Sequence, residues 1–241
     1  MDLKCFKIFT ALLIVWVILV IIWSRILSSG SAKMARAPNP PPSMTLTFEI
    51  TQEWDGSPTG HDPIMITLSR SGNADSITME VTAPFFNDPG NPGGEPGKPF
   101  VELWQYEVVE AFFLGENSKY LEVILGPHGQ HFVLILNVVN GVRNHIQTKL
   151  PIEFKTKINA EDKTWQGIAE IPLEYFPPKM SRFNAYAMHG LDKNRQYEAL
   201  FPAPSGEHEK PDFHNLKYFK TVDYNVLLPD TYQSKLWSEV E

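Results

Sequence analysis

The stretch from residue 103 to residue 136 combines an aromatic side chain with carboxylates in a way that suits binding of a polar ligand. Trp104 lies near its start, and Glu107 and Glu110 interrupt an otherwise apolar run. An exposed tryptophan ring stacks on the apolar face of a sugar, while carboxylates accept hydrogen bonds from its hydroxyl groups. A tryptophan packed between two sheets of a core fits the same pattern, so the sequence leaves both roles open for Trp104.

The two glutamates are separated by three positions, which is an odd number. Because side chains alternate across a strand, we expect Glu107 and Glu110 on opposite faces of a sheet. One of them should then be buried, and an unpaired buried carboxylate is costly. We therefore expect it to pair with Arg182 or Arg195, in a structural salt bridge or in a contact that also serves a ligand.

Four histidines raise the question of a metal site: His128, His131, His189 and His214. His128 and His131 lie three positions apart across a predicted turn, but no cysteine accompanies them, and zinc takes three or four convergent ligands. Haem would need two axial ligands, and Met188 and His189 are neighbours that point to opposite faces of a strand. The sequence predicts neither a metal centre nor a cofactor.

Motifs of known catalytic sites are absent from the sequence. It contains no Gly-x-Ser-x-Gly, no Walker loop, no Gly-x-Gly-x-x-Gly, and only one cysteine, Cys5. Glycosidases need two facing carboxylates, and nothing in the sequence places two acids opposite each other. Calcium would find oxygen ligands at Asp88 and Glu95, but no calcium motif matches. The sequence favours binding over catalysis, and no catalytic residue is assigned.

The elements that would position these side chains are strands. Short apolar or alternating runs between Gly and Pro turns predict strands at 45–53, 64–68, 77–81, 107–114, 120–125, 131–136, 142–152, 164–171, 183–188 and 196–201. No segment of this part has a helical period longer than two turns. The pattern predicts an all-β domain, an antiparallel β-sandwich. Residues 83–100, with five Pro and four Gly, form a long loop of the kind that is often functional.

The N-terminal segment 1–36 differs from the rest of the chain. Ile8 to Trp23 is uncharged and apolar, and the longer stretch 6–27 reaches the length needed to cross a hydrocarbon core of ~30 Å at ~1.5 Å per residue. We expect a transmembrane helix that is retained as a single-pass membrane anchor. A cleaved signal peptide is the alternative. Basic residues flank both sides, so the orientation stays open.

The remaining boundaries follow from composition. Residues 37–44 are a proline-rich linker, and 45–228 form the β-sandwich domain. Residues 229–241 are expected to be a polar C-terminal tail. Met34 and Met44 lie on either side of the linker, and either would start a soluble form without the anchor.

Charge is distributed unevenly along the chain. Residues 1–36 carry five of the 21 Lys and Arg residues and one of the 28 Asp and Glu residues. The rest of the chain therefore holds 16 basic and 27 acidic residues. So acidic a domain offers no electrostatic surface for nucleic acid.

The central stretch resembles the signature of the family-nine carbohydrate-binding modules and their DOMON-like relatives. The residues that carry the resemblance are Trp104, Glu107, Val109, Glu110 and Phe112, then Tyr120, Glu122, Pro127 and Gly129. Trp165, Arg182–Asn184 and Pro211–His214 resemble later segments of these families, in the same order. The resemblance implies a sandwich with a binding role: modules of this type hold sugar ends between tryptophans, and other relatives hold haem or sugars.

A closer resemblance is to an uncharacterised family of small eukaryotic proteins. It rests on the segments 54–56, 83–86, 94–100, 197–202 and 211–214. Members of that family generally lack a hydrophobic N-terminus, which is where this chain departs from the pattern. The resemblance implies no activity.

Taken together, the resemblances imply a non-catalytic domain that binds a carbohydrate or a similar polar small ligand. The residues expected to bind it are Trp104 as the stacking platform, with Glu110, Arg182, Asn184, His189 and His214 as hydrogen-bond partners. The first alternative is a protein-interaction scaffold, in which the long loop and the acidic surface meet a basic partner. The second alternative is a hydrolase built on the same sandwich.

Overall fold

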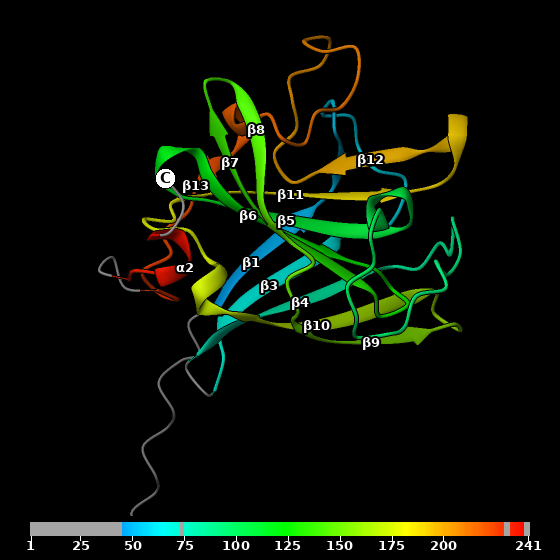
Figure 1. Ribbon diagram of the computed structural model, residues 1–241. Coiled ribbons are helices and arrows are strands. Elements are labelled where there is room, and N and C mark those ends of the chain that lie inside the picture. The colour runs from blue at the N-terminus through cyan, green and yellow to red at the C-terminus, as the bar shows by residue number, and fades with distance from the viewer. Residues whose placement is uncertain (1–44, 73–74, 229–231, 239–241) are drawn as a thin grey trace, which may run out of the picture. The chain divides into compact units, whose positions relative to one another are not determined.

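Strands are the main regular secondary structure in the part of the chain that the computed structural model describes, which comprises residues 45–72, 75–228 and 232–238. They form two antiparallel sheets that face each other across a hydrophobic core, so the predicted all-β, sandwich-like fold is confirmed (Figure 1). The expected anchor (Ile8–Trp23) and linker (37–44) lie outside the described residues. Within the described part, no helix has the length and apolar character needed to cross a membrane.

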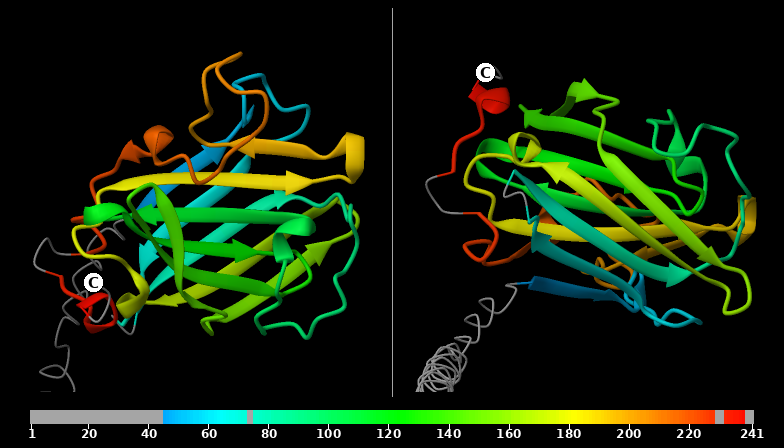
Figure 2. Two further views of the ribbon diagram at one scale, coloured as in Figure 1. Left: turned by 45° about the horizontal axis from the view of Figure 1, so that its top comes forward. Right: turned by 90° about the horizontal axis from the view of Figure 1, so that it is seen from below.

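The two sheets differ in size. The five-stranded sheet has the order β1 (Thr45–Ile50), β3 (Ile64–Arg70), β4 (Ser76–Pro84), β10 (Thr164–Pro172) and β9 (Glu153–Asn159). The eight-stranded sheet has the order β2 (Gln52–Glu53), β12 (Gln196–Ala199), β11 (Arg182–His189), β5 (Val108–Leu114), β6 (Lys119–Leu125), β7 (His131–Val139) and β8 (Val142–Thr148), and β13 (Lys220–Thr221) pairs with β11. Figure 2 shows both sheets from two further directions.

Helical segments are short and lie in the connections. Among the residues that the structure describes, they are the 3-10 turns η1 (Leu103–Gln105), η2 (Glu116–Ser118), η3 (Leu173–Tyr175), η4 (Asp192–Asn194) and η5 (Leu216–Tyr218), and one α-helical turn, α2 (Lys235–Ser238). Of these, η1 carries Trp104.

Strands β5, β6 and β7 are buried on both faces, which explains why their sequences are almost continuously apolar. On the inner face, side chains such as Phe113 and Val123 join the core between the sheets. On the outer face, side chains such as Phe112 and Ile124 form a second apolar cluster. The connection after β12 helps to cover this cluster, since Phe213 stacks on Tyr186 with ring centroids 3.9 Å apart.

Two expectations need correction. The strand predicted at 142–152 ends at Thr148, and a separate strand, β9, follows at the edge of the other sheet. The C-terminal segment is not simply a polar tail, because Trp237 is buried and its indole N–H donates to the carbonyl oxygen of Tyr175 at 3.0 Å. Among the described residues of 229–241, this large apolar ring is bound into the core.

Candidate functional site

A cavity of about 680 Å³ opens on the outer face of the eight-stranded sheet. Its lining includes two carboxyls from neighbouring strands, Glu110 on β5 and Glu122 on β6. Trp104 also lines the cavity and is 39% exposed, so its ring is accessible to a ligand. Further lining side chains that argue for polar recognition are Arg143, His145, Arg195, Tyr197, Asp212 and His214.

Glu110 and Glu122 share a face because of the register of the hairpin. Glu110 pairs with Ile124 and Phe112 pairs with Glu122, so Glu122 lies two register positions from Glu110 and on the same side of the sheet. Both side chains are almost fully buried. This corrects the expectation that no two acids are brought together.

Burial sets the charge of this pair. Burial, and then repulsion from Glu122, raises the pKa of Glu110 well above its ordinary value. Burial also raises the pKa of Glu122 to about 8, against the attraction of the Arg143 guanidinium. Near neutral pH Glu122 is therefore mainly a carboxylic acid, and the raised pKa of Glu110 favours the same protonated form, in which a carboxyl donates one hydrogen bond and accepts others.

His214 stands beside Glu122 with Nε2 4.0 Å from Oε2, and its Nδ1 lies 3.0 Å from the hydroxyl oxygen of Tyr120. Burial, with repulsion from Arg143 and His145, lowers the pKa of His214 to about 3. A neutral imidazole therefore faces a neutral carboxyl, and the contact is not an ion pair at neutral pH.

Arg195 fixes the part of the rim that carries Trp104. Its Nη2 donates to the carbonyl oxygens of Trp104 and Tyr106, at 2.6 and 3.0 Å. Its Nη1 donates to those of Gln105 and Gly190, at 3.1 and 3.0 Å. Four backbone acceptors thus occupy this guanidinium, which replaces the salt bridge to Glu107 or Glu110 that the sequence led us to expect.

The structure brings three of the six predicted ligand residues, Trp104, Glu110 and His214, to one cavity. Asn184 does not belong to it. Its amide nitrogen donates to the Tyr186 hydroxyl and to the Phe201 carbonyl, and its oxygen accepts from the backbone N–H groups of Ala185 and Phe201. These bonds use the full capacity of the amide, so Asn184 is a structural residue.

Arg182 and His189 also lie away from the cavity lining. Arg182 reaches the carbonyl oxygen of Leu216 at 3.5 Å. His189 lies on the inner side of β11, where it and His61 both contact Glu198. The spacing of these residues in the sequence did not predict this cluster. These three residues are the group within the described chain whose donor atoms are close enough to hold a metal ion.

The other histidines that suggested a metal are separated. His131 is buried beside Phe154, and burial lowers its pKa to about 4, which is the behaviour of a neutral core imidazole. His128 contacts the Asn87 side chain at 3.0 Å.

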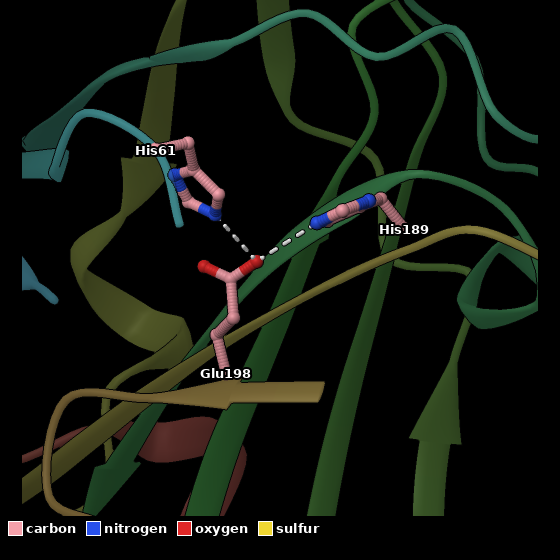
Figure 3. A group of neighbouring side chains, drawn as sticks. All are labelled: His61, His189 and Glu198. Atoms are coloured by element: carbon pink, nitrogen blue, oxygen red, sulfur yellow. Dashed lines mark hydrogen bonds and ion pairs between the residues drawn. The ribbon is translucent and has the colours of Figure 1, made fainter. Parts of the chain in front are cut away.

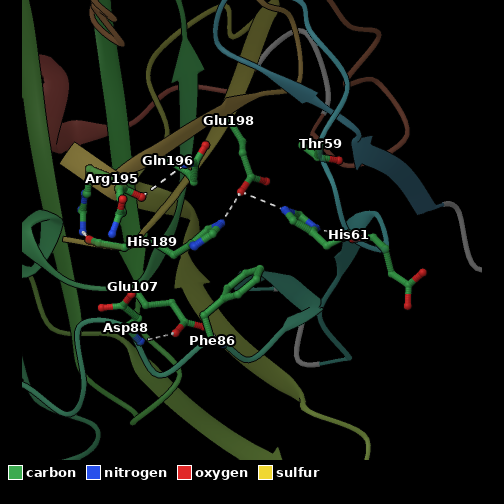
Figure 4. A network of polar contacts seen from close by, with 12 residues as sticks. Thr59, His61, Phe86, Asp88, Glu107, His189, Arg195, Gln196 and Glu198 are labelled. Carbon is green, nitrogen blue, oxygen red and sulfur yellow. Dashed lines mark hydrogen bonds and ion pairs between the residues drawn. The ribbon is translucent and has the colours of Figure 1, made fainter. Parts of the chain in front are cut away.

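The long loop at 83–100 is fixed by a buried carboxylate. Glu107 accepts hydrogen bonds from the backbone N–H groups of Phe86 and Asp88, at 3.2 and 3.4 Å (Figure 4). Burial nevertheless raises the pKa of Glu107, because desolvation outweighs these bonds. The predicted opposite placement of Glu107 and Glu110 holds: Glu110 lines the cavity, and Glu107 supports the loop.

Sequence reasoning missed Glu122, Arg143, Arg195 and Tyr197 as cavity residues. Glu122 could have been predicted, because a hairpin that turns at 115–119 places the side chains of residues 110 and 122 on the same face of the sheet. Arg143 and Tyr197 come from strands whose neighbours are set by topology, which sequence spacing does not reveal.

Comparisons with known proteins agree on family and fold. No family model matches the chain. The mouse UPF0462 protein C4orf33 homolog is 49% identical over 192 residues, which is 78% of this chain and 96% of the mouse protein. Human UPF0462 protein C4orf33 is 46% identical over 199 residues, 80% of this chain and 96% of the human protein. The zebrafish homolog is 43% identical, with 80% and 98% covered.

One solved structure is similar in fold. It is a protein from Bacteroides uniformis that is provisionally named a carbohydrate-binding protein, with a TM-score of 0.51 and 13% identity. The match covers 74% of this chain and 85% of that one. The extent and identity of the sequence matches establish that this chain belongs to the family of UPF0462 protein C4orf33.

Proposed function

We propose that this protein binds a carbohydrate or a similar uncharged polyhydroxylated ligand in the cavity on the outer face of the eight-stranded sheet. One observation carries the proposal: an accessible tryptophan, Trp104, lines the same cavity as two buried carboxyls, Glu110 and Glu122, whose raised pKa values favour the protonated form. The ring offers a flat apolar surface, and the carboxyls offer donors and acceptors together. A sugar presents the same two kinds of surface.

The protonated carboxyls favour an uncharged ligand over a cation. They give no strong attraction to a positive charge, and they hydrogen-bond to an uncharged polar ligand without the cost of removing an ion from water. The guanidinium of Arg195 is already bound to four carbonyl oxygens. The provisional name of the Bacteroides protein of similar fold supports the same class of ligand.

A thermal-shift experiment tests the proposal. Full-length protein is screened against mono- and disaccharides at millimolar concentration, where binding to the native state raises the Tm by mass action. Trp104→Ala should weaken binding of any active sugar by at least about tenfold, since a buried aromatic contact is commonly worth more than 1.4 kcal/mol. Ile168→Ala, which truncates an exposed side chain of β10, is the matched control and should bind normally.

Two results would contradict the proposal. A panel in which no sugar shifts the Tm, or in which the shift survives Trp104→Ala, removes this cavity as a sugar site. A protein partner that depends on the 83–100 loop would then favour the scaffold function.

The pair of carboxyls favours a second candidate, acid–base hydrolysis of the bound ligand. Glycoside hydrolysis employs two carboxyls, one protonated as the general acid and one ionised as the nucleophile or base, so this candidate requires one of Glu110 and Glu122 to ionise when the ligand binds. Turnover of a glycoside that persists with chelator and is lost in Glu110→Gln, while the variant still binds the sugar, would establish it. Binding without turnover by the unchanged protein leaves the non-catalytic role.

A further inference from the structure

Three side chains from distant parts of the chain meet on the inner side of the eight-stranded sheet (Figure 3). His61 lies before β3, His189 ends β11, and Glu198 lies on β12. Nε2 of His61 is 3.1 Å from Oε1 of Glu198, and Nε2 of His189 is 3.2 Å from the same oxygen. The three donor atoms lie within 4.8 Å of one another, so both rings point a nitrogen at one carboxylate oxygen.

The second nitrogen of His61 shows which atom carries its proton. Nδ1 lies 2.8 Å from the carbonyl oxygen of Asp62, which can only accept, so Nδ1 must donate. In a neutral ring, Nε2 then presents a lone pair to the Glu198 carboxylate. Two such acceptors repel unless a proton or a metal ion lies between them. Histidines that bind metals commonly hold their other N–H on a carbonyl in this way.

Glu198 supplies an independent observation. Its side chain is fully buried, and its Oε2 has no hydrogen-bond partner among the described residues. Glu53 of β2 is its direct cross-strand neighbour. Two carboxylates side by side, one with an unpartnered oxygen, form an environment that a cation stabilises.

The distances match metal coordination. Donor atoms ~2.0–2.1 Å from a tetrahedral zinc ion lie about 3.3 Å from each other, close to the two spacings between imidazole nitrogens and Oε1. Two imidazoles and a carboxylate, without a thiolate, are typical ligands of Zn²⁺ and related divalent transition metals.

The long loop holds the imidazoles in place (Figure 4). The Phe86 ring stacks on His189 with centroids 3.6 Å apart and planes 6° apart, and it meets His61 edge-on at 5.1 Å. Because the backbone of Phe86 is itself bound to Glu107, the orientation of His189 is fixed before any ligand arrives. This gives the 83–100 loop a positioning role.

We propose that His61, His189 and Glu198 bind one divalent transition-metal ion of the Zn²⁺ type, with a fourth coordination position left for water or for Glu53. This site is separate from the proposed sugar cavity. Tyr197 lines that cavity, and the next residue on β12, Glu198, points to the opposite face.

Metal titration tests the proposal. Full-length protein is treated with chelator, and Zn²⁺ binding is then measured by calorimetry. We expect one equivalent to bind, and His61→Ala, His189→Ala and Glu198→Gln each to weaken binding at least tenfold to a hundredfold, since loss of a mere supporting contact often costs that much. His208→Ala removes a histidine that contacts Tyr218 and should leave zinc binding unchanged. Equal loss in His208→Ala overturns the assignment.

A measurement on the unchanged protein avoids reliance on variants that fold poorly. Nitrogen-15 NMR of the imidazole rings should show Zn²⁺ shifting the Nε2 signals of His61 and His189, while those of His128 and His208 stay in place. Co²⁺ should add visible absorption bands of a tetrahedral or five-coordinate site. If one equivalent of Zn²⁺ leaves the two ring signals unchanged, the cluster is an imidazolium–carboxylate ion pair and the proposal fails.

Discussion

Buried glutamates on the two faces of the eight-stranded sheet have different surroundings. On the outer face, the basic side chain next to Glu122 is His214, 4.0 Å away and with a pKa lowered to about 3, and burial raises the pKa of both Glu110 and Glu122. On the inner face, Glu198 is as deeply buried but has two imidazoles within 3.2 Å. The same residue type therefore supplies neutral hydrogen-bonding groups on one face and a candidate anionic ligand on the other.

The difference shows that neighbours decide the chemistry of a buried carboxyl more than burial does. Arg195 lines the outer cavity and still does not ionise the pair, because its guanidinium is bound to backbone carbonyls. On the inner face, the nearest groups are two imidazoles that both direct Nε2 at Oε1 of Glu198. The two proposals, an uncharged polyol on one face and a cation on the other, rest on this difference.

A reciprocal experiment gives the sharpest contrast between the faces. Glu198→Gln should lower the Zn²⁺ affinity at least about tenfold and leave sugar affinity unchanged, while Trp104→Ala should do the reverse. Both affinities are measured by calorimetry on each full-length variant. If either substitution weakens both ligands, the two places act as one site and the contrast is wrong.

Gly190 lines the proposed sugar cavity and directly follows His189 of the proposed metal site, so a substitution there should affect both sites. It follows His189 with φ +82°, and an added Cβ would lie 2.3 Å from the carbonyl oxygen of Asn194. We expect Gly190→Ala to lower the free energy of unfolding by about 1–3 kcal/mol, as seen in urea denaturation. Gly206→Ala shares the positive φ but meets nothing within 4 Å, so its loss should be nearer 1 kcal/mol. Equal losses would mean that backbone strain alone matters.

The protonation of the outer pair predicts a smaller effect of pH on stability. A folded-state pKa of Glu122 of about 8, above its ordinary value of 4.5, means that the folded protein binds the proton more tightly than the unfolded chain. Stability from this group is complete below pH 4.5 and is lost as pH rises through 8. His214 and His131, with lowered pKa values, act in the opposite direction below pH 6.5.

The window from pH 6.5 to 8 therefore isolates the carboxyls. There Glu122 alone should lower the free energy of unfolding of the unchanged protein by about 1–2 kcal/mol, given ~1.4 kcal/mol per pH unit for one proton, and Glu110, whose pKa is also raised, should add to this decline. Urea denaturation at several pH values measures it. The decline should be smaller in Glu122→Gln, and an identical decline would show that Glu122 is already ionised.

The sequence predicts the sheets better than it predicts the sites. Alternation and turn residues locate most strands, because a strand's own side chains report which faces are buried. β9 was missed because only two of its positions, Phe154 and Ile158, carry the apolar alternation between charged residues. Its existence depends on β10, its partner in the sheet.

Part of the cavity lining could also be predicted from the sequence. Trp104, Glu110 and His214 were expected to be ligand residues and do line one cavity. Asn184 and His189 were not separable from them by residue type, since their roles follow from what the fold places beside them. His61 could not be foreseen at all, because it reaches Glu198 across 137 positions of sequence.

The four carbonyl contacts of Arg195 have a consequence for how a ligand would be received. They order the η1 backbone during folding, so that the rim around Trp104 is already in place. Binding then requires little loss of backbone conformational entropy, and the ligand meets a preorganised surface. We therefore expect the backbone around this cavity to change little when a ligand binds. Selectivity would then depend on the shape of the ligand and on the directions of its hydroxyl groups.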